Sequence, residues 1–239
     1  MQKFLSLILA MALICTVASS LAETKITVSG SGDTLIPADI AVVSLGVSAR
    51  DKDVLKAQQK ANEAIAAIRA ILTENGIAPE DINTGYVNIY AIYDYSEELE
   101  EIAAYNASST LAIRVSDMAV VGQVIDLAFS AGANTLNGID FSASDTTEAR
   151  ASALKKAVQD ARAKAEILAE ASGLKITKIE AVMEGGTYSY DSGLNNFRKE
   201  TIEAELDAGY GAPTVIQAAK LQVSATVSIT FVAEEATAE

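Results

Sequence analysis

The stretch from Leu221 to Phe231, LQVSATVSITF, alternates apolar and polar residues without a break. Successive side chains of a β-strand point to opposite faces of a sheet, so this period of two predicts a strand with one buried face. The apolar positions that we expect to face the core are Leu221, Val223, Ala225, Val227, Ile229 and Phe231. A strand this regular belongs inside a folded sheet, and the rest of the chain must supply its neighbours and its cover.

Six further stretches are predicted to be strands, because their apolar residues alternate or because turn residues bound a short apolar run. They cover Lys25–Gly32, Asp39–Ala49, Ile82–Tyr95, Ser108–Val115, Leu136–Ser142 and Ile176–Met183. The third and fourth of them follow one another in the chain with only a loop between them. This order predicts a long β-hairpin.

Three helices are predicted between these strands, because apolar residues recur every three or four positions. They cover Asp51–Asn75, Met118–Ala131 and the region from Asp145 to Ser172. The third helix is rich in alanine on its apolar face, which implies close packing of its backbone on a sheet or on another helix. The residues expected on that face are Leu154, Val158, Ala161, Ala165 and Leu168.

Helices that alternate with strands and hairpins predict an α+β protein. We expect an antiparallel or mixed sheet with long helices packed on one side, and the long β-hairpin as part of it. The segment from about residue 185 to 213 has turn residues at both ends and no sustained periodicity, so we interpret it as a long mobile loop. The expected organisation is a single domain over residues 23–239.

Residues 1–22 have the pattern of a secretory signal peptide. Lys3 is followed by an apolar run over residues 4–17 and by small residues, with cleavage expected after Ala22. A lipid anchor on Cys15 is disfavoured, because the residue before it is large. The pattern predicts an extracytoplasmic protein that is secreted, periplasmic or associated with the cell envelope. The mature chain has no cysteine, so it forms neither disulfides nor thiolate metal sites.

The mature chain is strongly acidic. Removal of the signal peptide takes away Lys3 and no acidic residue, which leaves 17 basic against 32 acidic residues and a net charge of −15. Such a surface repels nucleic acid and anionic lipid headgroups, and it favours a cationic partner. No second apolar run approaches the roughly 18 residues of a membrane-spanning helix, so no transmembrane span is expected in the mature chain.

Histidine is missing from the whole chain, and this absence removes most hydrolytic chemistry. Histidine is the commonest general base, so Ser-His-Asp triads, His-bound zinc and His proton shuttles are excluded. Among 32 acids, some pair will meet the spacing of a hydrolase by chance, and there is no tryptophan to hold a sugar ring. We therefore expect no enzymatic activity, no catalytic residue and no cofactor, and an acid/base hydrolase is the least favoured alternative.

A dense group of carboxylates lies in the stretch from Tyr93 to Tyr105, YDYSEELEEIAAY. Its glutamates Glu97, Glu98, Glu100 and Glu101 are weak candidates for a divalent metal site. Calcium needs about six to eight oxygen ligands, usually with turn glycines between the carboxylates, and no glycine stands among these four. The alternatives are a cationic ligand bound by a monomeric protein at the tip of the hairpin, or a solvated turn. We therefore assign no metal.

The eight tyrosines all fall in the predicted hairpin or in the long loop. Exposed tyrosine near glycine and serine is common at contact surfaces between proteins. We expect the packing of the hairpin core to account for Tyr93 and for Tyr86 or Tyr90. The tyrosines that we assign to a contact with another subunit or partner are Tyr95, Tyr105, Tyr188, Tyr190 and Tyr210.

Several stretches, in this order, resemble the SIMPL-domain family of secreted and periplasmic proteins, a domain of unknown function. They are ITVSGSG, GIAPEDINTGYVNIYAIY, YNASSTLAIRVSD, GANTLNGIDFS, LAEASGLKITKI and the closing VSATVSITF. The resemblance covers essentially the whole mature chain. It implies a fold of this element order and an extracytoplasmic location, and it supplies no established catalytic residue.

The resemblance also implies self-assembly. A periplasmic antigen of this family forms a large channel-like ring, and another bacterial member is linked to defence against oxidative stress. The favoured hypothesis is therefore a non-enzymatic secreted or periplasmic protein that forms homo-oligomers and has a role in the envelope or in oxidative stress. We expect the hairpin and the tyrosine-rich loop at or near its interfaces.

Overall fold

The structure, a computed structural model, describes residues 23–94, 101–185, 190–192, 214–218 and 220–236. In chain order its elements are β1 (Thr24–Pro37), β2 (Ile40–Asp51), α2 (Val54–Glu74), the 3₁₀ turn η1 (Pro79–Asp81), β3 (Ile82–Asp94), β4 (Glu101–Val115), the 3₁₀ turn η2 (Met118–Val120), α3 (Val121–Ser130), β5 (Thr135–Ser142), α4 (Thr147–Ala171), β6 (Leu174–Glu184), β7 (Tyr190–Ser192) and β8 (Lys220–Glu235). The predicted signal peptide, residues 1–22, lies outside the described residues. So does most of the predicted loop, within which β7 is a short strand.

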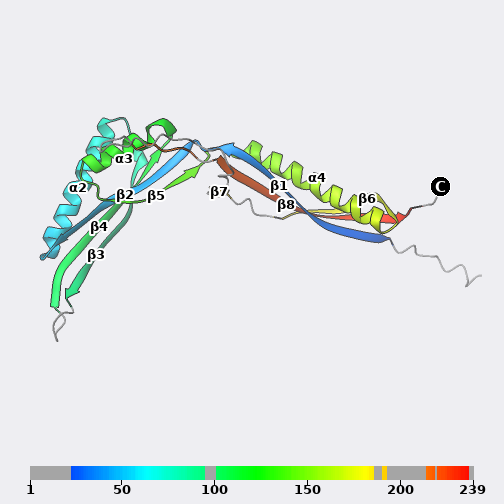
Figure 1. The fold of residues 1–239 in the computed structure, drawn as a ribbon, viewed down its shortest axis with the longest axis horizontal. Helices are drawn as coiled ribbons and strands as arrows, with labels where there is room; N and C mark the ends of the chain where they lie inside the picture. The colour runs from blue at the N-terminus through cyan, green and yellow to red at the C-terminus, as the bar shows by residue number, and fades with distance from the viewer. Residues whose placement is uncertain (1–22, 95–100, 186–189, 193–213, 219, 237–239) are drawn as a thin grey trace, which may run out of the picture. The chain divides into compact units, whose positions relative to one another are not determined.

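The strands form two antiparallel sheets, so the α+β class is confirmed and the single sheet that we expected is wrong. In one sheet β8 lies between β1 and β6, and β7 also pairs with β8. In the other the order is β3-β4-β2-β5 (Figure 1). The alternation of a strand shows which of its faces is buried but not which strand it pairs with. For that reason the sequence predicted β1 and β2 as two strands but could not show that they belong to different sheets.

The described residues group into two compact units. Unit 1 takes 23–32, 155–185 and 226–236, and unit 2 takes 33–94, 101–154, 190–192, 214–218 and 220–225. Three elements, β1, α4 and β8, contribute residues to both units. The single domain over residues 23–239 stays a prediction, which one cooperative unfolding transition would support.

The prediction for the last strand is confirmed in detail. All six apolar residues of LQVSATVSITF are buried, and the residues between them are half-buried or exposed. β8 is the central strand of its sheet, with β1 on one side and β6 on the other. A central strand with one helix-covered face needs this alternation, because each apolar residue on the wrong face would be left in water.

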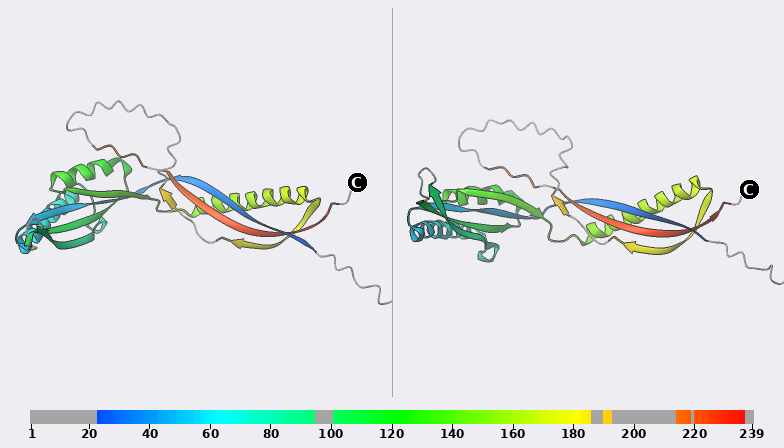
Figure 2. Two further views of the ribbon diagram at one scale, coloured as in Figure 1. Left: turned by 60° about the horizontal axis from the view of Figure 1, so that its bottom comes forward. Right: turned by 90° about the horizontal axis from the view of Figure 1, so that it is seen from below.

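α4 packs on the sheet of β1, β8 and β6 through alanine, and both views of Figure 2 show it along one face of that sheet. Alanine at every fourth position is buried: Ala149, Ala153, Ala157, Ala161, Ala165 and Ala169. Opposite this stripe, β1 has Gly30. A Cβ atom added there would lie 2.6 Å from the amide nitrogen of Ala161 and closer still to the carbonyl oxygen of Ala157. The two backbones can approach this closely only because both partners are small.

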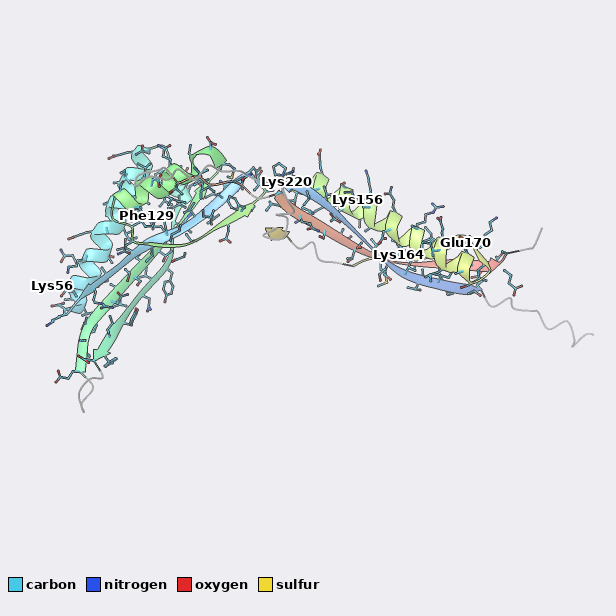
Figure 3. All side chains as sticks on the ribbon, viewed as in Figure 1. Lys56, Phe129, Lys156, Lys164, Glu170 and Lys220 are labelled. Atoms are coloured by element: carbon cyan, nitrogen blue, oxygen red, sulfur yellow. The ribbon has the colours of Figure 1, made fainter. Side chains whose placement is uncertain are left out.

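The predicted face of this helix is partly wrong, since Val158 and Leu168 remain 37% and 47% exposed. The buried alanines recur every four residues, and larger residues such as Val158 and Leu168 lie at the flanks of the contact between α4 and the sheet. Polar contacts hold one flank, where Asp160 accepts a hydrogen bond from the backbone N–H of Ser31 at 2.8 Å and Lys164 donates to the carbonyl oxygen of Ser29 at 3.2 Å. Figure 3 shows Lys164 on α4.

Unit 2 buries one face of its four-stranded sheet under α2 and α3. The shared core combines apolar residues of β2 and β4 with Ile68 and Leu72 of α2 and the buried face of α3. β2 and β4 pair in continuous register, with Leu45 opposite Leu111, so that both point towards the helices. This regular pair fixes where the outer strands β3 and β5 can lie.

α2 begins and ends close to the predicted positions. Its N-cap is Asp53, whose side chain accepts from the backbone N–H groups of Leu55 and Lys56. Asp51, the first residue of the predicted helix range, instead accepts from the N–H of Asp53. The helix ends before Gly76, whose φ of 93° lies in the region that favours glycine.

β3 and β4 pair antiparallel from Ile82 opposite Ile113 to Asp94 opposite Glu101. The register shifts between Thr84 and Tyr86 and again between Ile92 and Tyr93. The residues between the two strands, 95–100, lie outside the described part of the chain. β4 begins at Glu101, earlier than the expected Ser108, because its first half pairs along the outer half of β3.

We expect Gly30→Ala to destabilise the mature chain by about 2 kcal/mol, because the new methyl group overlaps the backbone of α4 and forces helix and strand apart. The control is Gly85→Ala in β3, where the nearest atom to an added Cβ is 3.6 Å away, an ordinary contact. This control should change stability by less than about 0.5 kcal/mol. Urea unfolding followed by circular dichroism measures both. Equal losses in the two variants would contradict the close approach of α4 to β1.

Candidate functional site

Three of the four candidate glutamates, Glu97, Glu98 and Glu100, lie outside the described residues. Glu101 begins β4, where it is exposed and lies opposite Asp94 of β3. Among the residues that the structure describes, no group of three or more Asp, Glu, Cys or His is placed to hold a metal ion. The hypothesis of a metal or cationic ligand at this tip stays a prediction, because most of its residues are not described.

The five candidate interface tyrosines are not brought together within the described residues. Tyr95, Tyr188 and Tyr210 lie outside them. Tyr190 belongs to β7, which pairs with β8 in antiparallel register. Tyr105 lies in β4, half-buried, and packs against a small cluster of buried alanines of α2 and β4. The contact role of these five residues stays a prediction.

The exposed tyrosines of the described part are in β3. Tyr86, Tyr90 and Tyr93 are 57%, 50% and 45% exposed, and Val87 is 60% exposed. The expectation that hairpin core packing accounts for such tyrosines is wrong. The sequence does carry a signal for this surface, which is the absence of charge from Ile82 to Tyr93. The alternation in the same stretch indicates only a strand.

β3 is exposed because it is an edge strand that the helices cover only in part. Arg69 of α2 donates to the carbonyl oxygen of Ile82 and to the hydroxyl of Thr84, at the start of the strand. β4 lies on one side of it, and no described strand pairs with its other side. α2 packs mainly on β4 and β2, and it contacts β3 much less. Figure 1 shows β3 at the border of the sheet. The free edge therefore presents backbone N–H and C=O groups together with exposed apolar and aromatic side chains.

Between its two register shifts, this edge lacks the charges and prolines that usually protect edge strands. Charged residues, proline and bulges normally keep such strands from pairing with another chain. β3 has no charge until Asp94, its last residue, although 21% of the chain is charged. By contrast, β1 carries Lys25, Asp33 and Pro37, and β6 carries two lysines and two glutamates. β3 and β6 each have two register shifts, but those of β6 lie in the middle of the strand and leave only short runs in unbroken register.

Next to β3, the sheet face opposite the helices is polar. Asn106 is buried there, its Oδ1 accepts from the Ser48 hydroxyl at 2.9 Å, and its Nδ2 donates to the Ser108 hydroxyl at 2.8 Å. Tyr90 lies opposite Asn106 and therefore on the same face, because paired residues of an antiparallel ladder point the same way. This face combines tyrosine with serine and asparagine, a composition typical of contact surfaces.

Unit 2 also has a half-open cavity of about 370 Å³ between the end of α2 and α3. Its lining combines the charged residues Arg114, Asp81 and Asp117 with apolar residues of α3. Arg114 pairs with Asp81 at 3.6 Å, and Asp117 accepts from the backbone N–H of Ala119 at 2.9 Å. The volume is that of a small-molecule site. The charged groups nevertheless have partners within the protein, so the cavity has no evident selectivity for a ligand.

The residues after the predicted loop are fixed to α3. Thr214 donates from its backbone N–H to Asp126 Oδ2 at 3.1 Å and from its hydroxyl to Oδ1 at 2.6 Å. Gly122, one turn earlier in α3, leaves room for the carbonyl of Thr214, which an added Cβ would overlap. Ile216 packs against the core beside them. Residues 214–218 are therefore a docked segment of unit 2.

The shifted pKa values in the described residues all favour the charged form. The pKa values of five aspartates are lowered because each accepts hydrogen bonds from a neighbouring hydroxyl, ammonium or amide group: Asp39, Asp51, Asp126, Asp145 and Asp160. The pKa of Lys178 is raised, chiefly because it donates to Glu23. General acid–base catalysis near neutral pH requires the opposite shifts. These groups stabilise contacts and are not tuned for proton transfer.

Comparison with known proteins identifies relatives. The family described as "SIMPL: Protein of unknown function (DUF541)" matches residues 26–231. The chain is 30% identical over 165 residues to the 26 kDa periplasmic immunogenic protein of Brucella melitensis, a match that covers 67% of this chain and 66% of that protein. It is 25% identical over 157 residues to the uncharacterized protein YggE of Escherichia coli K12, which covers 66% and 64% of the two chains. The chain thus spans just under two thirds of these curated relatives.

We expect acid to loosen the contact between Thr214 and Asp126. The pKa of Asp126 is lowered in the folded protein, chiefly by the Thr214 hydroxyl and then by its N–H. The stabilisation is therefore fully present above the unfolded pKa of about 3.9 and is lost as the pH falls through the lower folded value. The amide resonance of Thr214, followed by NMR between about pH 7 and pH 2.5, should shift with a midpoint below about 3.9.

In Asp126→Asn this titration of the Thr214 amide should disappear. The control is Asp140→Asn, which changes an exposed aspartate of β5 and should keep the wild-type titration. A titration that persists in Asp126→Asn would show that another group moves the Thr214 amide.

Proposed function

Because the chain belongs to the SIMPL family of proteins of unknown function, we propose that it is a non-enzymatic, extracytoplasmic protein that works as a homo-oligomer. The observation that carries this proposal is the uncharged, exposed edge strand β3 in a protein that is otherwise strongly acidic. A long edge of this kind is a template for pairing with another chain.

An extracytoplasmic location is supported by the signal-peptide pattern of residues 1–22 and by the name of the Brucella relative, which is called periplasmic. In the part of the chain that the structure describes, no helix is long and apolar enough to cross a membrane. An oligomer in such a compartment would be part of the cell envelope. The role in oxidative stress implied by the family resemblance stays a prediction.

A non-enzymatic role is supported by the residue inventory and by the direction of the pKa shifts. The chain has no histidine, and the carboxyl groups with shifted pKa values, such as those of Asp39 and Asp126, are more acidic than usual, not less.

The exposed side chains of β3 support self-association over a purely soluble monomer. Tyr86, Val87 and Tyr90 expose about half of their surface or more, although apolar side chains of this size gain free energy on leaving water. Tyrosine is enriched at the energetically important positions of protein interfaces. A partner that covers β3 would remove this apolar surface from water. The same contact would form hydrogen bonds with the backbone groups at the free edge of the sheet.

We expect the mature chain, residues 23–239, to be oligomeric. Size-exclusion chromatography with light scattering over a concentration series should give a molar mass that is a multiple of the monomer mass. Because the contact is mainly apolar and hydrogen-bonded, the oligomer should persist when NaCl is raised from about 0.1 M to 1 M, where surface charge interactions are screened. A strict monomer at the highest concentration would overturn the assembly part of the proposal.

A further inference from the structure

We propose that two copies of this chain associate through β3, with each β3 pairing antiparallel with the β3 of the other copy about a two-fold axis. This inference rests on the proposed homo-oligomer, and it names the surface and the geometry of one of its contacts. It makes the sheet of unit 2 continuous across two molecules.

The usable part of the edge is the seven-residue segment Tyr86–Ile92. It lies between the two register shifts of β3 and pairs with β4 without interruption. In an antiparallel sheet, alternate residues direct their N–H and C=O groups to opposite sides of the strand. The N–H and C=O groups that point away from β4 can form a ladder of hydrogen bonds with a second strand. No described strand of the same chain occupies that side.

Charge favours a second copy of the same strand as the partner. The chain has a net charge of −14, so two copies repel one another over most of their surfaces. The segment Tyr86–Ile92 carries no charge, and Asp94 lies beyond its end. In an antiparallel pair, the Asp94 residues of the two copies would lie at opposite ends of the contact. The two chains can therefore meet here without bringing these carboxylates together.

The side chains of the segment also complement themselves. Antiparallel pairing centred on Ile89 places Tyr86 opposite Ile92 and Asn88 opposite Tyr90 on one face. On the helix-covered face it places Val87 opposite Ala91 and Ile89 opposite its own copy. Aromatic residues paired with β-branched ones across strands stabilise a sheet, and an asparagine beside a tyrosine hydroxyl can share a hydrogen bond.

The other edges of the described sheets are poorer partners. β6 presents lysines, glutamates and two register shifts, and β1 carries charges and Pro37. β5 is short and has Gly138 at an irregularity of its register. Pairing of β3 with itself is isologous, so it uses the free edge on both molecules and closes after two copies instead of growing into a fibre.

The test uses single cysteines, because residues 23–239 contain none. Cysteine is placed at each position from 87 to 91 in turn, the protein is oxidised, and the disulfide-linked dimer is measured on a non-reducing gel. Only a residue on the two-fold axis faces its own copy closely enough for a disulfide. We expect the yield to peak at Ile89→Cys and to fall symmetrically on both sides.

The matched control is Ile179→Cys, an exposed apolar residue of the other edge strand, β6. It should give at most about one tenth of the dimer formed by Ile89→Cys, because cysteines that do not face one another closely cannot be bridged. A yield that is flat over positions 87–91, or equal to that of Ile179→Cys, would overturn the proposed pairing.

A charge placed on the edge gives an independent measurement that does not alter the core. Val87→Lys puts an ammonium group at an exposed position of β3, and lysine on an edge opposes strand pairing. The molar mass by light scattering should fall at least twofold, while Ile179→Lys on β6 should leave it unchanged. Circular dichroism confirms that both variants are folded.

The two proposals fail in different ways. A monomeric wild-type chain overturns the homo-oligomer and this inference with it. A wild-type oligomer whose mass is the same in Val87→Lys and whose cross-links do not centre on Ile89 overturns only the pairing through β3. In that case the homo-oligomer stands on another surface.

Discussion

The arrangement of unit 2 depends on a helical layer that is narrower than the sheet beneath it. α2 and α3 bury the apolar faces of β2 and β4, and these two strands pair in continuous register through the centre of the sheet. Little helical surface is left for β3, which lies beyond β4. β3 is exposed because the helical layer is narrower than the sheet. The proposed contact between two copies of the protein depends on this exposure.

The sequence predicted the faces of the elements better than their neighbours. The alternation of β8 and the alanine content of α4 both reflect local spacing, and both correctly indicated buried surfaces. The division into two sheets could not be predicted in this way, because period two is the same whichever strand lies alongside. For the same reason the exposure of Tyr86 and Tyr90 was missed, since an alternating strand at the edge of a sheet resembles one at its centre.

The contact role of the five candidate tyrosines stays a prediction, and the exposed tyrosines of β3 are not among them. Of the five, Tyr105 is half-buried and packs on alanines of α2 and β4. The more informative feature was the absence of charge over twelve residues of an acidic chain. Its meaning depends on knowing that the strand is an edge, which only the sheet order supplies.

The position of β8 between β1 and β6 has a consequence for biosynthesis. β1 and its partner are separated by more than 180 residues, so their sheet cannot form until residues 220–235 have been synthesised. Unit 2 takes most of its core from the continuous segment 33–154 and can fold earlier. If the chain crosses a membrane unfolded, β1 and α4 would therefore reach the far side before their sheet can form. Insertion of the central strand β8 would be the last large step of folding.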